Sequence, residues 1–257
     1  IEQPFSNVPT IESSQTEVAG LVVANVNSTY LVLTSSSLLE PGMNYIVRLS
    51  DEVQTEAAFV CRNTASGIGI VSINASKLTA EQRNSIAVAQ LDNSYMVKQG
   101  DLVIASGKLY ETSKGVSYGT IAGSKVEYSK DSGYEVFETS VSITAGGFAI
   151  LFNSEGNVVG VSKASTDTST KFIGISDLKA QIETMINEHG IMYCGITGQN
   201  VTDELAAKYG LPSGVYISNV DIDSPAYYAG LQAGDVISSI NGQSILTIQQ
   251  FSEKLYQ

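Results

Sequence analysis

Short apolar runs separated by glycine, asparagine and serine follow one another from Gly20 onward. These runs are rich in valine, isoleucine and tyrosine, and they recur at spacings of about 8–12 residues. Many short strands at this spacing predict a mainly β architecture, either a barrel or a sandwich. The clearest runs are Leu21–Ala24, Tyr30–Leu33, Tyr45–Leu49, Ala58–Cys61, Gly69–Ile73, Asp101–Ala105 and Phe148–Phe152.

The pattern changes after Ser176, where the apolar spacing becomes helical. A helix over 177–186 would place four apolar residues on one face, with Asp177 at its N-terminus and His189-Gly190 after its end. These four residues are Leu178, Ile182, Met185 and Ile186. We therefore expect a domain boundary near His189.

Beyond this boundary, strands and helices alternate. We expect strands over 192–197, 214–220 and 236–240, helices over 202–209 and 226–229, and a last helix that opens near Thr247. Ser224-Pro225 is a helix-opening pair, and Gly230 can end that short helix in a left-handed conformation. Asn241-Gly242 predicts a tight hairpin turn.

The ordered run over 224–242 resembles the PDZ domain of the bacterial HtrA (Deg) family. That family has an aromatic-x-Gly-apolar loop for peptide carboxylates, and Tyr193, Cys194, Gly195 and Ile196 match it. Glycine lets adjacent N–H groups converge on a C-terminal carboxylate, and the next strand can pair with the peptide. The family pattern continues with a closing strand, so we expect the PDZ domain to be incomplete at its C-terminus.

The resemblance also implies that the last helix forms the second wall of the peptide groove. The residues in question are Ile248, Phe251 and Leu255. The alternative interpretation is that these three side chains belong to the domain core.

With the PDZ domain fixed, the preceding part of the chain resembles the trypsin-like domain of the same family, which implies a double β-barrel. Four segments carry this resemblance: Leu33–Leu39, Ser66–Val71, Val97–Gly107 and Asn153–Val161. The expected domains are an N-terminal arm over 1–19, the trypsin-like domain over 20–188 and the PDZ domain over 190–257.

None of the three catalytic positions implied by this resemblance carries a catalytic residue. Ser37 stands in place of the histidine, Gly67 in place of the aspartate and Gly147 in place of the serine; a shift by one residue would bring the equally inert Gly146 there. A Ser-His-Asp hydrolase needs an imidazole to accept the serine proton, and the one histidine of the chain is His189. Phe148 also replaces a glycine of the oxyanion loop.

Other nucleophiles are not favoured by the sequence. We expect Cys61 to be a buried strand residue, and no spacing supports a Ser-Lys pair. A disulfide between Cys61 and Cys194 is not expected, and no metal-ligand cluster or cofactor motif is evident. The net charge of -12 argues against partners such as nucleic acids or anionic membrane surfaces.

Three functions remain open. The favoured one is a catalytically inactive HtrA-like scaffold that reads C-terminal or exposed peptides. The alternatives are an active HtrA-type endopeptidase in envelope protein quality control, with a misassigned site, and a structural or oligomerisation module. The resemblance implies a bacterial, extracytoplasmic protein that can form a homotrimer. Because the chain starts with Ile1, we expect a processed or truncated product. The resemblance also implies an N-terminal membrane anchor that is not in this chain.

Overall fold

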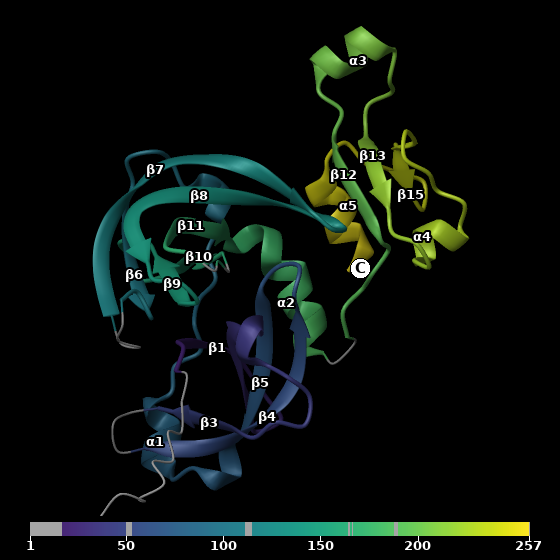
Figure 1. Cartoon of the computed structure of the whole chain (residues 1–257). Coiled ribbons are helices and arrows are strands. Elements are labelled where there is room, and N and C mark those ends of the chain that lie inside the picture. The colour runs from purple at the N-terminus through teal and green to yellow at the C-terminus, as the bar shows by residue number, and fades with distance from the viewer. Residues whose placement is uncertain are drawn as a thin grey trace, which may run out of the picture.

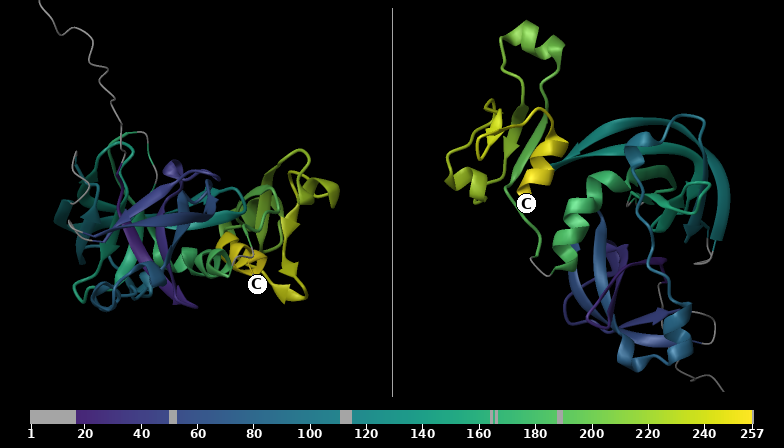
Figure 2. Two further views of the ribbon diagram at one scale, coloured as in Figure 1. Left: turned by 90° about the horizontal axis from the view of Figure 1, so that it is seen from below. Right: turned by 180° about the vertical axis from the view of Figure 1, so that it is seen from behind.

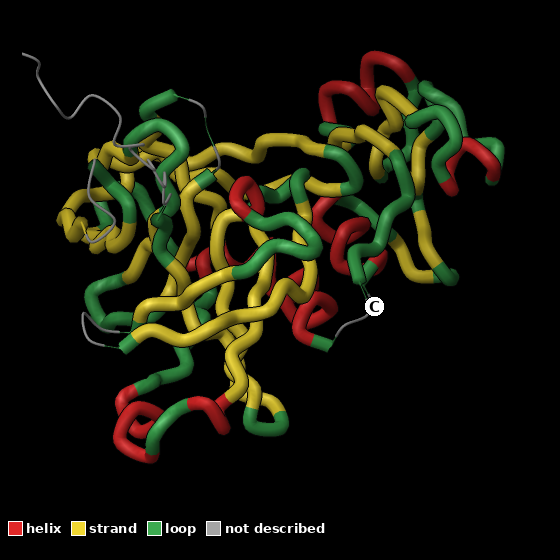
Figure 3. Tube along the Cα trace, turned by 60° about the horizontal axis from the view of Figure 1, so that its bottom comes forward, coloured by secondary structure: helices red, strands yellow, loops and turns green. Residues whose placement is uncertain are grey.

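The computed structural model describes residues 17–49, 53–110, 115–163, 165, 167–187 and 190–256. Two β-sheet bodies are followed by a smaller α+β module, as the family resemblance implies (Figure 1). Strands dominate the first two bodies, and their helices are short (Figure 3). The predicted arm up to residue 16 and His189 lie outside the described residues. Val18 and Ala19, expected in the arm, already pack against the first core.

The first sheet has the strand order β1-β2-β5-β4-β3, and its pairings are antiparallel. Its strands are β1 Gly20–Val26, β2 Thr29–Ser35, β3 Tyr45–Arg48, β4 Gln54–Asn63 and β5 Ile68–Asn74. Successive side chains of β2 point to opposite sides of the sheet, and both sides are covered, so the strand is buried on both faces. Leu31 and Leu33 enter the core shared with the second sheet, whereas Tyr30 and Val32 enter a separate core.

The second sheet is a closed barrel with the order β10-β11-β8-β7-β6-β9. Its strands are β6 Leu102–Gly107, β7 Gly115–Ser129, β8 Ser132–Ile143, β9 Ala149–Phe152, β10 Val158–Ser162 and β11 Ser169–Gly174. Phe137 and Phe172 fill its interior. Its six strands pair in a closed ring.

The β7–β8 hairpin is the longest element of the barrel, and it was not among the strand runs singled out from the sequence. Its two strands are 15 and 12 residues long. Ser129 pairs with Ser132, so Lys130 and Asp131 form a two-residue turn, with Asp131 at φ 55°. The hairpin tip projects from the barrel to the C-terminal module (Figures 1 and 2).

Short helices connect these strands. They are η1 Ser36–Leu38, η2 Ala75–Lys77, α1 Ala80–Ser85, η3 Ser94–Met96, η4 Ile175–Leu178 and α2 Lys179–Ile186. The helix predicted over 177–186 is present with a later start, because α2 begins at Lys179. Leu178, Ile182 and Met185 are buried in the core between the two sheets. Asp177 instead lies within η4, where Oδ2 accepts a hydrogen bond from the Glu135 N–H at 2.6 Å.

The C-terminal module is built around the three-stranded sheet β12-β13-β14. Its elements are β12 Ile196–Asn200, α3 Asp203–Tyr209, β13 Val215–Val220, α4 Pro225–Tyr228, β14 Val236–Ile237, β15 Ser239–Ile240, β16 Gln243–Ser244 and α5 Ile248–Leu255. Thr202, Ser224 and Thr247 cap the three helices through their side-chain oxygens. Asn241 and Gly242 form the predicted tight turn, both at positive φ.

Two predicted strands have different bounds. The strand expected over 192–197 begins only at Ile196, because Gly195 has φ 93° and turns the chain. The strand expected over 236–240 is divided into β14, which pairs with β13, and β15, which pairs with β16.

Candidate functional site

Two of the three positions that the resemblance assigns to a catalytic triad lie side by side. Ser37 is in the short helix η1, and the N–H of its neighbour Ser36 donates to the Gly67 carbonyl at 3.0 Å. The Ser37 hydroxyl is exposed and hydrogen bonds with the Ser35 hydroxyl at 2.8 Å. Gly67 is buried at φ 77°. This corner therefore keeps its backbone contacts but has neither an imidazole nor a carboxylate.

The third position, Gly147, precedes β9 in a tightly packed turn. Its N–H donates to the Thr144 carbonyl at 2.9 Å. A Cβ atom on Gly147 would overlap the Lys108 carbonyl oxygen and would lie 2.9 Å from the Thr144 carbonyl oxygen. The adjacent Phe148 is 1% exposed and packs in the core between the sheets. A serine side chain does not fit at Gly147 unless the backbone moves.

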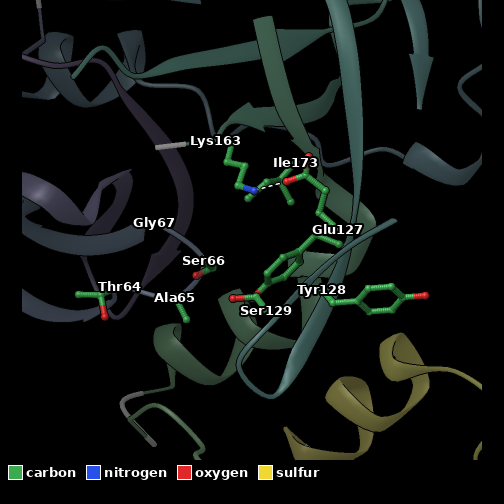
Figure 4. A pocket seen from close by; sticks show the side chains of 10 residues that line it. Thr64, Ala65, Ser66, Gly67, Glu127, Tyr128, Ser129, Lys163 and Ile173 are labelled. Atoms are coloured by element: carbon green, nitrogen blue, oxygen red, sulfur yellow. Dashed lines mark hydrogen bonds and ion pairs between the residues drawn. The ribbon is translucent and has the colours of Figure 1, made fainter. Parts of the chain in front are cut away.

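A small pocket of about 140 Å³ borders Gly67 (Figure 4). Loop residues 64–67 line one side, and β7, β8, β11 and the residue directly after β10 contribute Glu127, Tyr128, Ser129, Tyr134, Ile173 and Lys163. The Glu127 carboxylate pairs with Lys163 and, at 2.9 Å, with Lys171. The Lys163 hydrogen bond, supported by Lys171, lowers the pKa of Glu127 to about 2. A carboxylate held in this way is a poor general base near neutral pH.

The aromatic-x-Gly-apolar loop forms a distinct site in the C-terminal module. Three successive backbone N–H groups, from Cys194, Gly195 and Ile196, converge on one carboxylate at 2.8–2.9 Å. That carboxylate belongs to Asp131, at the tip of the β7–β8 hairpin. A Cβ atom on Gly195 would overlap the Ser224 side chain, so both φ and packing favour glycine there.

The two candidate groove walls are β12 and α5. Ile248 and Phe251 are buried in the core of the module, and Leu255 is half-buried against it. A Cβ atom on Gly133 of the hairpin would overlap Ile248 Cγ2, and one on Gly198 of β12 would lie 3.7 Å from Ile248 Cδ1. Ile248 is therefore both a core residue and the helix residue that faces the hairpin. The assignment of Ile248, Phe251 and Leu255 to a peptide-groove wall stays a prediction.

The remaining residues of the loop have no nucleophilic character. Burial raises the pKa of the Cys194 thiol to about 11, which keeps it protonated. The Tyr193 hydroxyl donates to Asp221 Oδ2 at 2.8 Å. Their assignment as peptide-binding residues stays a prediction.

Asp131 is the residue of this site that the sequence reasoning did not identify. A signal was present: Val116, Tyr118, Val126 and Tyr128 alternate with polar residues, and Lys130–Gly133 has the composition of a turn. That pattern would have predicted the hairpin. It could not have shown that the turn reaches a loop more than sixty positions away.

The two cysteines are free thiols. Cys61 is half-buried, not fully buried as expected, because β4 exposes part of this face, and its thiol donates to the Met185 carbonyl at 3.7 Å. Within the described ranges, no group of three or more His, Cys, Asp or Glu residues could hold a metal ion. No helix in that part of the chain is long and apolar enough to cross a membrane.

Comparison with known families defines a class that fits this geometry. Residues 19–161 match the trypsin-like peptidase domain, and residues 216–257 match the PDZ domain. A peptidase-type double β-sheet fold is thus joined to a PDZ module. The chain belongs to the HtrA family of trypsin-like peptidases.

Curated relatives are named "Probable periplasmic serine endoprotease DegP-like". The protein of Pseudomonas savastanoi pv. phaseolicola is 28% identical over 84% of this chain and 46% of its own length. The protein of Marinomonas sp. is 28% identical over 95% of this chain and 52% of its own length. The chain thus spans about half the length of these relatives.

Solved structures share the fold. "HtrA-type protease AlgW with decapeptide" has a TM-score of 0.63 at 20% identity and covers 92% of this chain and 73% of its own. "HtrA-type protease AlgW with tripeptide" has a TM-score of 0.63 at 22% identity and covers 92% of this chain and 79% of its own.

Proposed function

We propose that this chain is a non-catalytic HtrA-type protein that serves as a scaffold outside the cytoplasm and reads C-terminal or exposed peptide segments through its PDZ domain. The observation that carries the proposal is a contrast within one molecule. The loop over residues 193–196, called the carboxylate loop here, already binds a carboxylate through its backbone N–H groups. By contrast, the three positions assigned to the catalytic triad carry Ser37, Gly67 and Gly147, which cannot supply the triad chemistry.

The chemistry of acyl transfer supports the non-catalytic part. A serine nucleophile needs a base within hydrogen-bond reach and donors for the oxyanion. Ser37 has another hydroxyl as its partner, and Gly147 is packed against backbone carbonyls. The Glu127 carboxylate, which lines the adjacent pocket, is held by lysines.

The peptide-reading part is supported by the carboxylate loop and by the solved relatives. The AlgW structures carry a decapeptide and a tripeptide by their titles. The relatives' description as periplasmic favours an extracytoplasmic location. By family resemblance we expect a homotrimer and a membrane anchor outside this chain.

Turnover of an unfolded protein tests the non-catalytic part directly. The purified chain should leave casein intact, and a fluorophosphonate probe, which labels activated serines, should not label it. Casein cleavage that co-elutes with the chain through two different columns would overturn the proposal. Cleavage that separates from the chain identifies a contaminating protease.

A further inference from the structure

The tip of the β7–β8 hairpin occupies the place where a peptide would bind. The Asp131 side chain is 5% exposed, and its two carboxylate oxygens accept hydrogen bonds from the N–H groups of Cys194, Gly195 and Ile196. A carboxylate that accepts several backbone N–H bonds is in the arrangement that a peptide C-terminus requires.

The backbone of the tip adds to this resemblance. The Asp131 N–H donates to the Ile196 carbonyl at 2.8 Å, and Lys130 forms an antiparallel bridge with Thr197 of β12. A bound peptide that extends a sheet edge makes the same type of contact. The edge of β12 next to the loop is therefore paired with the protein's own chain.

The helix side of the groove is filled by the same hairpin. The Ser132 hydroxyl hydrogen bonds with the Ser252 hydroxyl of α5 at 3.0 Å, and both groups are buried. Gly133 packs directly on Ile248. The tip residues 130–133 thus lie between β12 and α5 (Figure 1).

We infer that Asp131 is a built-in ligand of the PDZ domain, and that peptides with a free C-terminal carboxylate bind only when they displace the hairpin tip. This inference rests on the proposed peptide-reading function and names its regulation. A tethered ligand competes at a high effective concentration. The apparent affinity for a free ligand is then the intrinsic affinity multiplied by the fraction of molecules in which the hairpin tip has left the groove, called open here. If about one molecule in ten is open, removal of the carboxylate strengthens peptide capture about 10-fold.

The sharpest variant is Asp131→Gly. Glycine adopts the positive φ of this turn, so the hairpin keeps its shape while the carboxylate is lost. The matched control is Asp223→Gly, because Asp223 has the same charge and φ 61°, and its side chain accepts a hydrogen bond from the Tyr228 hydroxyl at 3.0 Å. Both full-length variants are checked by circular dichroism.

Two measurements are made on each protein. The first is backbone hydrogen exchange at residues 194–196. The second is capture of a fluorescein-labelled pool of short random peptides with free C-termini, beside the same pool with amidated C-termini. We expect faster exchange and about 10-fold stronger capture of the free-carboxylate pool by D131G, weak capture of the amidated pool, and wild-type behaviour of D223G.

The outcomes separate the two ideas. Equal capture by the wild type and D131G overturns the built-in ligand but leaves peptide reading intact. Faster exchange without capture by either form overturns peptide reading and keeps Asp131 as the occupant. Unchanged exchange in D131G overturns the occupancy itself.

A second variant covers the case in which D131G does not fold. Gly133→Ala keeps the carboxylate but places a Cβ atom onto Ile248, whereas Gly123→Ala, in the same hairpin, meets nothing within 4 Å. Gly133→Ala should give faster exchange at residues 194–196 and stronger peptide capture, and Gly123→Ala should behave as the wild type. Identical behaviour of these two variants would overturn the inference.

Discussion

The vacant catalytic corner and the carboxylate loop differ in which atoms carry the chemistry. Serine-protease catalysis depends on side chains, so the proposed loss of activity through Ser37, Gly67 and Gly147 requires no change in the backbone contacts. The carboxylate loop uses backbone N–H groups. These donors survive most substitutions as long as Gly195 keeps its turn.

Both regions contain a closely packed glycine, but the packing has opposite consequences. At Gly195, the Ser224 side chain fixes a turn that directs three donors to one point. At Gly147, the Lys108 and Thr144 carbonyls fill the space that a nucleophile would need. The loop at Gly195 is thus preorganised for a carboxylate, whereas the turn at Gly147 has no room for a serine side chain.

The largest expected effect comes from placing a side chain back at the nucleophile position. Gly147→Ser should lower the free energy of unfolding by about 3 kcal/mol, because its Cβ atom overlaps a backbone oxygen that cannot rotate away. The measurement is urea unfolding followed by fluorescence or circular dichroism.

Gly146→Ser is the matched control for this prediction. Gly146 has φ 64°, and a Cβ atom placed there would meet nothing within 4 Å, so only the backbone strain of about 1 kcal/mol is expected. Equal losses in the two variants would mean that the Gly147 turn relaxes easily, and the comparison between a closed and a preorganised glycine would fail.

The sequence was sufficient where local chemistry decides the structure. The helix caps Thr202 and Ser224 and the Asn241-Gly242 turn follow from preferences within a few residues. The flanking motifs assign three positions to a triad, and the structure brings two of them, Ser37 and Gly67, close together. The assignment itself stays a prediction. The aromatic-x-Gly-apolar motif located the loop whose N–H groups converge.

The remainder depends on contacts between distant segments. The meeting of Asp131 with Gly195 requires the length of the hairpin and the orientation of the PDZ module, and no local pattern encodes either. The start of β12 at Ile196 was missed because residues 192–195 are apolar enough for a strand, while Gly195 leaves the extended region. The packing of Gly147 was equally hidden, because Lys108 lies in another segment.

A smaller effect is expected from the ionic contacts of Glu127 in the pocket that borders Gly67. The folded-state pKa of Glu127 is about 2, below its ordinary value of 4.5. The ion pair of Glu127 with Lys163 and Lys171 therefore stabilises the fold fully above about pH 4.5, and its contribution is lost as the pH falls from 4.5 to 2. Glu127→Gln should cost about 2 kcal/mol at neutral pH, since solvent screens part of the shift, and should flatten the acid limb of the unfolding curve.

Glu56→Gln provides the control for this titration. Glu56 pairs with Lys77 at 2.6 Å, but both side chains are exposed, so this variant should keep the wild-type acid limb. The same acid limb in Glu127→Gln and the wild type would contradict the assignment of that pair as the main ionic element of the pocket.

The smallest expected effect concerns the rim of the carboxylate loop. Lys130 reaches Asp221 at 2.6 Å and lies 5.9 Å from the centroid of the Tyr193 ring. Because Lys130 is largely solvated, Lys130→Met should weaken hairpin docking by less than about 1 kcal/mol, and salt should reduce the difference. A double-mutant cycle with Asp221→Asn at low and high salt, read by hydrogen exchange at residues 194–196, measures the coupling.

Lys208→Met is the control: it removes a similar lysine–tyrosine contact on α3, far along the chain from the hairpin, and should leave that exchange unchanged. A loss in Lys130→Met as large as that in Asp131→Gly would show that a solvated side-chain pair, and not the buried carboxylate with its backbone donors, holds the tip in place.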